Sequence, residues 1–211
     1  ALRVLKEVDL IACEDTRRTR RLLAHFGITT PLTSYFEHNK LKKGASLLRL
    51  LSAGKSVALV SDAGTPTISD PGSLLVSSAR AAGIPVVPIP GPSALSVALS
   101  ASGIPANRFV FEGFLPAKPG RRLSRLKALR ALETTVVLYE GPHRLVKTLV
   151  AIREVFGEIS LVVARELTKQ FEEIRAGTPE EHLAHFRERQ IRGEFTLVIP
   201  AACSTPEAGI Y

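Results

Sequence analysis

Residues 57–72 read Val-Ala-Leu-Val-Ser-Asp-Ala-Gly-Thr-Pro-Thr-Ile-Ser-Asp-Pro-Gly, and they say most about the fold class of this chain. The first four, Val57 to Val60, are apolar and predict a buried strand. A loop rich in Gly, Asp, Ser and Pro follows, and helix-like sequence resumes at Ser73. A strand, a polar loop and a helix in this order are typical of a parallel α/β sheet, which binds ligands beyond the carboxyl ends of its strands. We therefore expect a ligand site at this loop.

The sequence on both sides of this stretch alternates between strand-like and helix-like segments. Before it, we expect helices at 2–8, 17–26 and 45–51, strands at 9–13 and 31–36, and an exposed basic loop at 37–44. After it, we expect a helix at 73–82, a strand at 84–89 and a Gly/Pro turn at 90–93. A small-residue helix at 94–102 should then pack on the sheet. This alternation predicts a first α/β domain at residues 1–105, with a mostly parallel sheet and helices on both faces.

A linker-like segment at 103–107 precedes a second series of strands and helices. We expect strands at 108–114, 134–139, 160–164, 171–175 and 195–199, and a basic loop at 115–122. Three helices are expected as well: one ends near residue 132, one ends near residue 156, and one starts after Thr178. Thr178-Pro-Glu-Glu181 has the pattern of a capping box. The connection after residue 164 is too short for a crossover, so the next strand should be antiparallel. Residues 106–211 are therefore predicted to form a second α/β domain with a mixed sheet.

Composition places the chain among ordinary globular proteins. It has 211 residues, of which 45% are hydrophobic and 23% charged, and no apolar stretch is long enough to cross a bilayer. Cys13 and Cys203 make neither a metal quartet nor a disulfide framework, and Cys13 should be a buried thiol, which suits a reducing cytoplasm. The chain has no Met and opens in the middle of a helical pattern, so we expect its natural N-terminus to be missing.

The formal net charge of +8 favours polyanionic partners, with nucleic acid first and anionic membrane surfaces second. Four arginines stand in the first turns of the helix expected at 17–26, namely Arg17, Arg18, Arg20 and Arg21. Cations at this end of a helix oppose its dipole, which suggests an anion-binding edge, with surface solvation as the alternative. Further cations stand in the expected basic loops: Lys40, Lys42, Lys43, Lys118, Arg121 and Arg122.

Several kinds of site are disfavoured by the sequence. The loop at 61–72 lacks the lysine of a P-loop and the spacing of a Rossmann fingerprint, and no Gly-x-Ser-x-Gly elbow occurs. The five histidines lack the spacing of zinc ligands, so we expect no metal. Asp62 and Asp70 could contact a ribose or a cation, or they could cap turns.

Blocks of sequence along the whole chain resemble one family. They are Ile11-Ala-Cys-Glu-Asp-Thr-Arg17, Val60-Ser-Asp-Ala-Gly-Thr-Pro66, Ile68-Ser-Asp-Pro-Gly72, Pro90-Gly-Pro-Ser-Ala94, Phe111-Glu-Gly-Phe-Leu-Pro116, Tyr139-Glu140 with Pro142-His-Arg144, and Ala164-Arg-Glu-Leu-Thr-Lys169. In them the chain resembles the ribosomal RNA small-subunit methyltransferase I group of the tetrapyrrole methylase (class III) superfamily. The family begins with a further strand and a Thr-Pro-Ile-Gly-Asn-type loop, which does not precede Ala1, and it more often has Ser where Gly141 stands.

The resemblance implies an enzyme that transfers methyl from S-adenosylmethionine to the ribose 2′-hydroxyl of a cytidine in the decoding region of small-subunit (16S) rRNA. It implies a tetrapyrrole-methylase-like fold with the cofactor cleft between two domains, and a homodimer that meets naked rRNA or the assembled 30S subunit in the cytoplasm. The alternatives are a porphyrinoid methylase of the same superfamily and a non-catalytic RNA-binding module.

The resemblance also assigns roles to residues. Cofactor contacts are expected from Asp62, Ala63, Gly64, Thr65, Pro66, Pro90, Gly91, Pro92 and Ser93, and from Tyr139, Glu140, Glu194, Phe195 and Thr196. The cations expected to meet RNA are Arg17, Arg18, Arg20, Arg21, Lys118, Arg121 and Arg122. A general base is expected among Asp15, Glu14 and Glu166, although Glu14 and Asp15 could instead pair with the nearby arginines.

Overall fold

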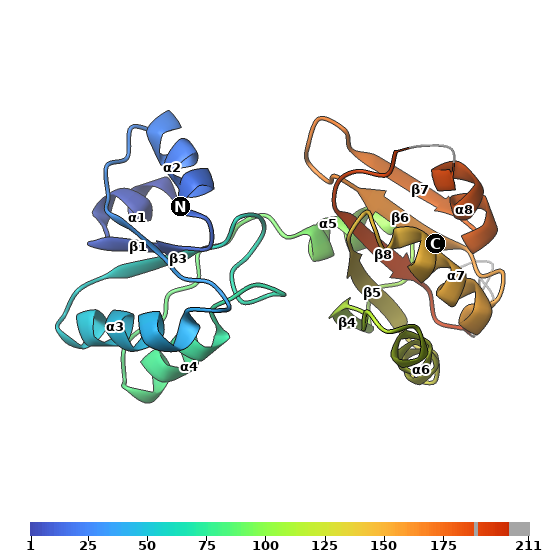
Figure 1. Cartoon of the computed structure of the whole chain (residues 1–211), viewed down its shortest axis with the longest axis horizontal. Helices are drawn as coiled ribbons and strands as arrows, with labels where there is room; N and C mark the ends of the chain where they lie inside the picture. The colour runs from blue at the N-terminus through green and yellow to red at the C-terminus, as the bar shows by residue number, and fades with distance from the viewer. Residues whose placement is uncertain (188–189, 203–211) are drawn as a thin grey trace. The chain divides into compact units, whose positions relative to one another are not determined.

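The computed structural model describes residues 1–187 and 190–202, and the chain divides into two compact units between Ser93 and Ala94 (Figure 1). We predicted the division between residues 105 and 106. The difference concerns helix α5 (Ala94–Ser102), which belongs to the second unit. Its central Ala98 is fully buried against Val137, Val162 and Val198 of that unit's sheet. The small residues of α5 thus pack on the second sheet and not, as we predicted, on the first.

The first unit contains a three-stranded parallel sheet with strand order β2-β1-β3. Its elements are α1 (Leu2–Glu7), β1 (Leu10–Cys13), α2 (Thr16–His25), β2 (Leu32–Ser34), α3 (Lys40–Ser52), β3 (Val57–Val60) and α4 (Ser73–Ala81). Cys13 at the end of β1 lies opposite Ser34 and Val60, so the three strands end at the same edge. The loops that follow them therefore meet there.

Helices cover both faces of this sheet, as predicted. Successive strand residues point to opposite faces, so Ile11 packs with Leu5 and Leu23 under α1 and α2, while Ala12 packs with Leu47 and others under α3 and α4. Cys13 is buried and free, as predicted, whereas Cys203 lies outside the described residues.

Three local predictions for this unit were wrong. Residues 84–89 form no strand, because Pro85 and Pro88 lack the N–H that a ladder requires and no described strand pairs with the segment. The basic segment at 37–44 is not a loop throughout, since α3 already begins at Lys40. β3 is a strand, but its residues are half-buried and not buried.

The second unit contains a five-stranded mixed sheet with strand order β4-β5-β8-β6-β7. Besides α5 its elements are β4 (Phe109–Phe114), α6 (Pro119–Arg130), β5 (Thr135–Glu140), α7 (Leu145–Phe156), β6 (Leu161–Arg165), β7 (Glu173–Gly177), α8 (Pro179–Arg187) and β8 (Phe195–Ile199). Only β4 and β5 are parallel, and β7 runs antiparallel to β6 as predicted. The expected basic loop at 115–122 is shorter than predicted, because α6 begins at Pro119.

The main core of this unit lies between the sheet and α6, α7 and α8. The capping box is confirmed: Glu181 N–H donates to Thr178 Oγ1 at 3.3 Å, and Thr178 N–H donates to Glu181 Oε2 at 2.7 Å. Within the described part of the chain, none of the helices has the length and apolar character that crossing a membrane requires.

Candidate functional site

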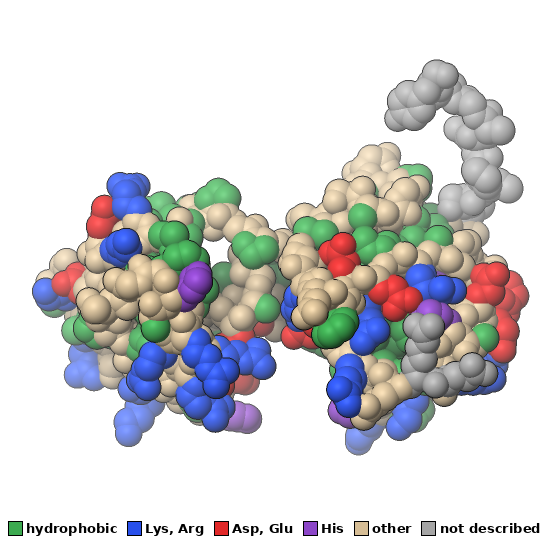
Figure 2. Space-filling model, turned by 90° about the horizontal axis from the view of Figure 1, so that it is seen from above, with side chains coloured by type: hydrophobic (Ala, Val, Ile, Leu, Met, Phe, Trp, Pro, Cys, Tyr) green, Lys and Arg blue, Asp and Glu red, His purple; other side chains and the backbone are tan. Residues whose placement is uncertain are grey.

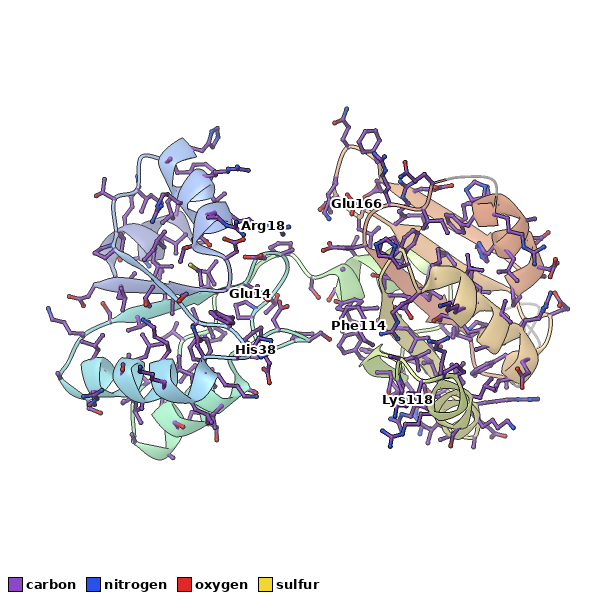
Figure 3. The ribbon with its side chains drawn as sticks, in the orientation of Figure 1. Glu14, Arg18, His38, Phe114, Lys118 and Glu166 are labelled. Carbon is purple, nitrogen blue, oxygen red and sulfur yellow. The ribbon has the colours of Figure 1, made fainter. Side chains whose placement is uncertain are left out.

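Asp62 joins the loops at the carboxyl edge of the first sheet. Its Oδ1 accepts a hydrogen bond from the backbone N–H of Asp15 at 3.0 Å, and its Oδ2 lies 3.5 Å from a guanidinium nitrogen of Arg18. The loop after β3 is thereby tied to the loop after β1. Figure 3 shows Glu14, Arg18 and His38 at this end of the first unit. The Asp62 carboxylate has partners from the protein itself, so its main contribution is to hold the two loops together.

Two of the predicted cofactor segments, 62–66 and 90–93, lie against each other. Thr65 Oγ1 donates to the carbonyl of Pro92 at 3.0 Å, and a Cβ added at Gly64 would be 4.0 Å from the same oxygen. Ala63, Gly64, Pro90, Gly91 and Pro92 are all exposed. A surface of small, exposed residues allows a ligand to approach the backbone closely, and this fits the predicted cofactor.

Strained backbone marks the loop at 61–72 and one loop of the second unit. Thr67 and Ser69 have φ of 74° and 62°, and Glu166 and Thr168, after β6, have φ of 47° and 65°. Left-handed φ is unfavourable for residues with a side chain, costs about 1–3 kcal/mol each and concentrates at functional sites. A fifth such residue, Glu133, lies in the turn before β5. None of the five is glycine, so their left-handed backbone could not be predicted from residue type.

The contacts of Asp15 argue against its predicted role as a base. It is the N-cap of α2, and its carboxylate accepts hydrogen bonds from the backbone N–H and from the guanidinium of Arg17, both at 2.8 Å. These bonds from Arg17 hold the pKa of Asp15 well below its usual range. A carboxylate so stabilised in its charged form is a weak proton acceptor.

Glu14 is in the opposite situation. Its side chain is half-buried and has no hydrogen-bond partner among the described residues. Burial raises the pKa of Glu14, the negative charges of Asp62 and Asp15 raise it further, and Arg18 lowers it. Among the three predicted bases, Glu14 alone has a pKa shifted toward neutrality.

Glu166 is held in a network of the second unit. Its Oε1 accepts hydrogen bonds from Lys169 Nζ and from the backbone N–H of Glu194, both at 2.9 Å. The bond from Lys169 lowers the pKa of Glu166, against the effect of burial. Gly193 allows this close approach, since a Cβ there would be 2.4 Å from Glu166 Cγ. Glu166 therefore stabilises its loop and is poorly suited to act as a base.

Three of the predicted second-unit cofactor contacts have internal side chains. Glu140 is 2% exposed, with Oε2 accepting from Thr148 Oγ1 at 2.6 Å and Oε1 accepting from Gly141 N–H at 2.9 Å. Phe195 packs on Phe186 in the core, with ring centroids 5.6 Å apart, and Thr196 is buried beside it in β8. The side chains of Glu140 and Phe195 are engaged within the fold and that of Thr196 is buried, which disfavours the predicted cofactor contacts through these three side chains.

Tyr139 and Glu194, in contrast, lie where a ligand can reach them. Glu194 is exposed and pairs with Lys169 Nζ at 2.8 Å. Tyr139 is half-buried, and its hydroxyl accepts a hydrogen bond from the N–H of Leu95 at 3.1 Å, which links β5 to the first turn of α5.

Most of the predicted RNA-binding cations are exposed. Figure 2 shows Lys and Arg side chains gathered on the surface of the first unit. The exposed members of the predicted set are Arg17, Arg18, Arg20, Arg21, Lys118 and Arg121. Arg122 is the exception: it is 4% exposed and donates to the carbonyl of Ala117 at 2.9 Å. Its prediction as an RNA contact was wrong, because α6 turns this residue toward the core.

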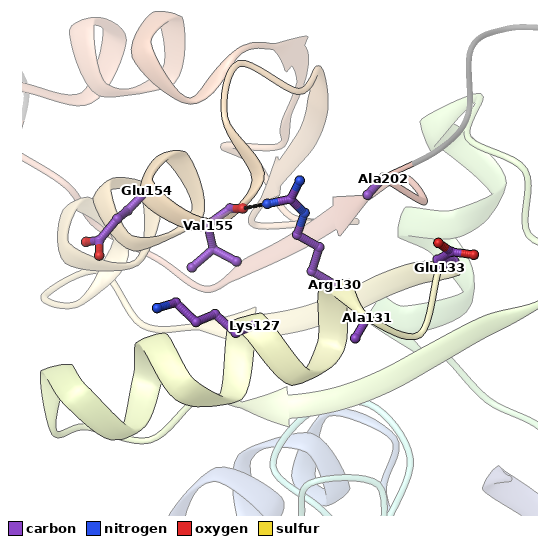
Figure 4. A pocket seen from close by; sticks show the side chains of 7 residues that line it. All are labelled: Lys127, Arg130, Ala131, Glu133, Glu154, Val155 and Ala202. Carbon is purple, nitrogen blue, oxygen red and sulfur yellow. Dashed lines mark hydrogen bonds between the residues drawn. The ribbon is translucent and has the colours of Figure 1, made fainter.

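A hollow of about 590 Å³ in the second unit lies away from all of these residues. Figure 4 shows its lining, which consists of Lys127, Arg130, Ala131, Glu133, Glu154, Val155 and Ala202. Arg130 donates to the carbonyl of Val155 across it at 2.5 Å. It lies by the last turns of α6 and α7, whereas ligand sites of such sheets lie beyond the carboxyl ends of parallel strands. We assign it no function.

Comparison with known proteins identifies the family. The profile described as Tetrapyrrole (Corrin/Porphyrin) Methylases matches residues 1–182. A Pseudomonas aeruginosa protein named ribosomal RNA small subunit methyltransferase I is 56% identical over 177 residues, which are 83% of this chain and 63% of that protein. The proteins of that name from Synechocystis sp. and Escherichia coli O157:H7 are 52% and 51% identical; the alignments cover 98% and 94% of this chain and 74% and 71% of theirs. The chain thus spans less than two thirds of the Pseudomonas protein.

Solved structures agree in fold. A diphthine synthase superposes with a TM-score of 0.73 at 16% identity, and the superposition covers 95% of this chain and 82% of the diphthine synthase chain. A cobalt precorrin-4 methyltransferase superposes with a TM-score of 0.68 at 17% identity, covering 96% and 88%. These confirm the predicted fold class. With the profile match and relatives 50–52% identical over 98–100% of its length, the chain belongs to the ribosomal RNA small subunit methyltransferase I family within the tetrapyrrole methylases.

Proposed function

We propose that this chain carries the activity of an S-adenosylmethionine-dependent methyltransferase that modifies the 2′-hydroxyl of a cytidine ribose in the decoding region of small-subunit (16S) rRNA. The observation that carries the proposal is its 48–56% identity to proteins named ribosomal RNA small subunit methyltransferase I. The paired segments at 62–66 and 90–93 and the exposed arginines of α2 support it. A homodimer in the cytoplasm is part of the same proposal.

The loops of the first unit are suited to holding the methyl donor in a fixed position. S-adenosylmethionine, when bound, supplies an electrophilic methyl group on a sulfonium sulfur. Ala63, Gly64 and Gly91 offer exposed backbone to it, and the hydrogen bond from Thr65 to Pro92 keeps their two segments at a fixed separation. Correct alignment of reacting groups can lower a barrier by about 7–11 kcal/mol. Orientation is therefore the main contribution that we assign to these loops.

Glu14 is the residue that we propose to accept the proton of the ribose hydroxyl at one of its carboxylate oxygens. Its pKa is raised by burial, and it has no competing hydrogen bond among the described residues. A base works best when its pKa approaches the working pH, and base catalysis contributes roughly 10²–10⁴-fold. Asp15 and Glu166 have lowered pKa values and are assigned structural roles.

The test is transfer of tritiated methyl from S-adenosylmethionine to small ribosomal subunits, with naked 16S rRNA and a precorrin-type substrate in parallel. A methylated 2′-hydroxyl can no longer attack the neighbouring phosphodiester, so the modified position resists alkaline hydrolysis and can be mapped. An RNA with 2′-deoxycytidine at the mapped position is the control, and it should accept no label. Label in the precorrin alone would identify a porphyrinoid methylase. No label and no heat of S-adenosylmethionine binding would identify a non-catalytic RNA-binding module.

A further inference from the structure

Three aromatic rings form a cluster at the carboxyl ends of the parallel strands β4 and β5. The ring of Tyr139 lies 4.8 Å from that of Phe111 and 6.0 Å from that of Phe114, both edge to face. Phe114 is 52% exposed at the end of β4, while Phe111 is half-buried. The cluster thus has two half-buried rings, Phe111 and Tyr139, and one ring exposed to solvent.

A β-bulge places Phe114 in this cluster. Phe111 lies opposite Val137 and Phe114 opposite Tyr139, with a shift of register between Phe111 and Gly113. In a regular strand two residues three apart point to opposite faces, so the extra residue brings both rings to the face of Tyr139. Gly113 has φ of 70°, which only glycine adopts without strain. Bulges of this kind re-aim side chains next to active sites.

The backbone beyond Phe114 is fixed by two arginines. Arg144 donates to the carbonyl of Leu115, and Arg122 donates to the carbonyl of Ala117 at 2.9 Å. Leu115 itself is 2% exposed and anchors the segment in the core. An exposed aromatic ring on such a backbone loses little entropy when a flat ligand stacks on it.

Unpaired cations follow the exposed ring. Lys118 and Arg121 are exposed, and neither forms an ion pair within residues 1–187 and 190–202. Arg125, one turn further on, is instead paired with Glu112 at 2.5 Å. Figure 3 shows Phe114 and Lys118 in the same region of the second unit. An aromatic face beside free cations fits a nucleotide, whose base stacks and whose phosphate meets the charge.

We propose that Phe114 is the platform on which an unpaired base of the RNA substrate stacks, with Lys118 and Arg121 meeting the adjoining phosphates. This rests on the proposed function, since it names how the same substrate is held. Stacking requires a base free of its helix, so the platform selects single-stranded RNA. The free charges favour this occupant over an apolar protein segment.

The absence of tryptophan from the chain allows a direct test. The Phe114→Trp variant has a single indole at the platform. Its fluorescence should be quenched to saturation by a single-stranded oligoribonucleotide, much less by the duplex of the same sequence, and not by inorganic polyphosphate, which carries charge alone. Phe109→Trp is the matched control, because Phe109 is 43% exposed on the same strand, away from Tyr139. It should show no such quenching.

A second experiment measures the affinity for RNA. Phe114→Ala should weaken RNA binding by roughly 5- to 150-fold, the usual loss for one stacked base, and Phe114→Tyr should restore it. The heat of S-adenosylmethionine binding and the melting temperature should be unchanged. Quenching by S-adenosylmethionine in place of RNA would assign the ring to the cofactor's adenine, and equal quenching of both Trp variants would make the contact non-specific; either result overturns the proposal. The fluorescence arm needs no catalysis, so it stands even if wild-type chain methylates no RNA.

Discussion

The loop at 61–72 and the loop at 166–172 both contain two strained residues but are stabilised in different ways. In the first unit, Thr67 and Ser69 lie in a loop of small residues, and Gly72 is closed in by the side chains of Leu59 and Thr67. In the second unit, Glu166 and its neighbours are joined by charge, with Lys169 bonded to two carboxylates.

The difference has a consequence for ligand binding. The first loop is packed behind Gly72 and is exposed at the small residues Ala63 and Gly64. The polar groups of the second loop are instead engaged with one another, which leaves them fewer free donors and acceptors for a ligand. We infer that the first loop binds a ligand and that the second holds its own residues in position.

The largest effect is expected from Glu14→Gln. It should lower kcat by roughly 10²–10⁴-fold, because the amide cannot accept the hydroxyl proton. Since the pKa of Glu14 is raised, the acid limb of the wild-type kcat/KM profile should lie above the ordinary value of 4.5. Asp15→Asn is the matched control: asparagine also caps helices, so turnover should be kept, and the acid limb should move to lower pH because the charge of Asp15 no longer raises the pKa of Glu14. The reverse ranking of the two variants would move the base to Asp15.

Gly72→Ala should cause the next largest effect. The new Cβ would lie 2.6 Å from Leu59 Cδ2 and 2.8 Å from Thr67 Cγ2, at φ of 145°. Strain and overpacking together should lower the free energy of unfolding by about 3 kcal/mol. Gly64→Ala, whose nearest neighbour is 4.0 Å away, should lower it by only about 1–2 kcal/mol. Urea titration compares the two, and equal losses would show that packing does not support the first loop.

Much of the fold could be predicted because apolar runs and glycine stops are local signals. β1, β3, β5 and β8 all follow from runs such as Val57 to Val60. Residues 84–89 also contain apolar residues but form no strand, since Pro85 and Pro88 interrupt the run and no described strand pairs with it. The bulge at Gly113 likewise depends on pairing with β5.

The candidate site was harder to predict because neighbouring residues can point in opposite directions. Arg121 is exposed and Arg122 buried, and the sequence did contain the reason: Arg122, Leu126 and Leu129 follow the helical period of the buried face. Reading the segment as a loop hid that pattern. Glu140 and Glu166 each have one partner far along the chain, Thr148 and Glu194, which lie 8 and 28 residues away, so the neighbouring sequence could not show how fully their carboxylates are engaged.

The adjacent residues Arg121 and Arg122 are the subject of the third prediction. Arg121→Ala should reduce the slope of log affinity for RNA against log salt by about 1 and leave stability unchanged, because an exposed phosphate contact is lost. Arg122→Ala should leave the slope unchanged and lower the free energy of unfolding by about 1–3 kcal/mol, because the buried Arg122 side chain loses its packing and its hydrogen bond to the carbonyl of Ala117. Salt-dependent filter binding and urea titration measure the two quantities. A changed slope for Arg122→Ala would return that residue to the RNA surface.

The smallest effect is expected from Lys169→Met, which removes the charge that joins Glu166 to Glu194. Lys169 is 43% exposed, and such ion pairs contribute about 0–1 kcal/mol, so global stability should fall by less than 1 kcal/mol. The pKa of Glu166 is lowered in the fold, so this stability is present above its ordinary pKa and is lost as pH falls through the lowered value.

The local effect of Lys169→Met should be larger than the global one. The N–H of Glu194 donates to Glu166 Oε1, so its hydrogen exchange should accelerate in Lys169→Met and in wild type at high salt, but not in Lys169→Arg. S-adenosylmethionine binding, which we assign to the first loop, should not change. If it did, charge pairing after β6 would support the cofactor as directly as the packing behind Gly72 does, and the division between a binding loop and a positioning loop would be wrong.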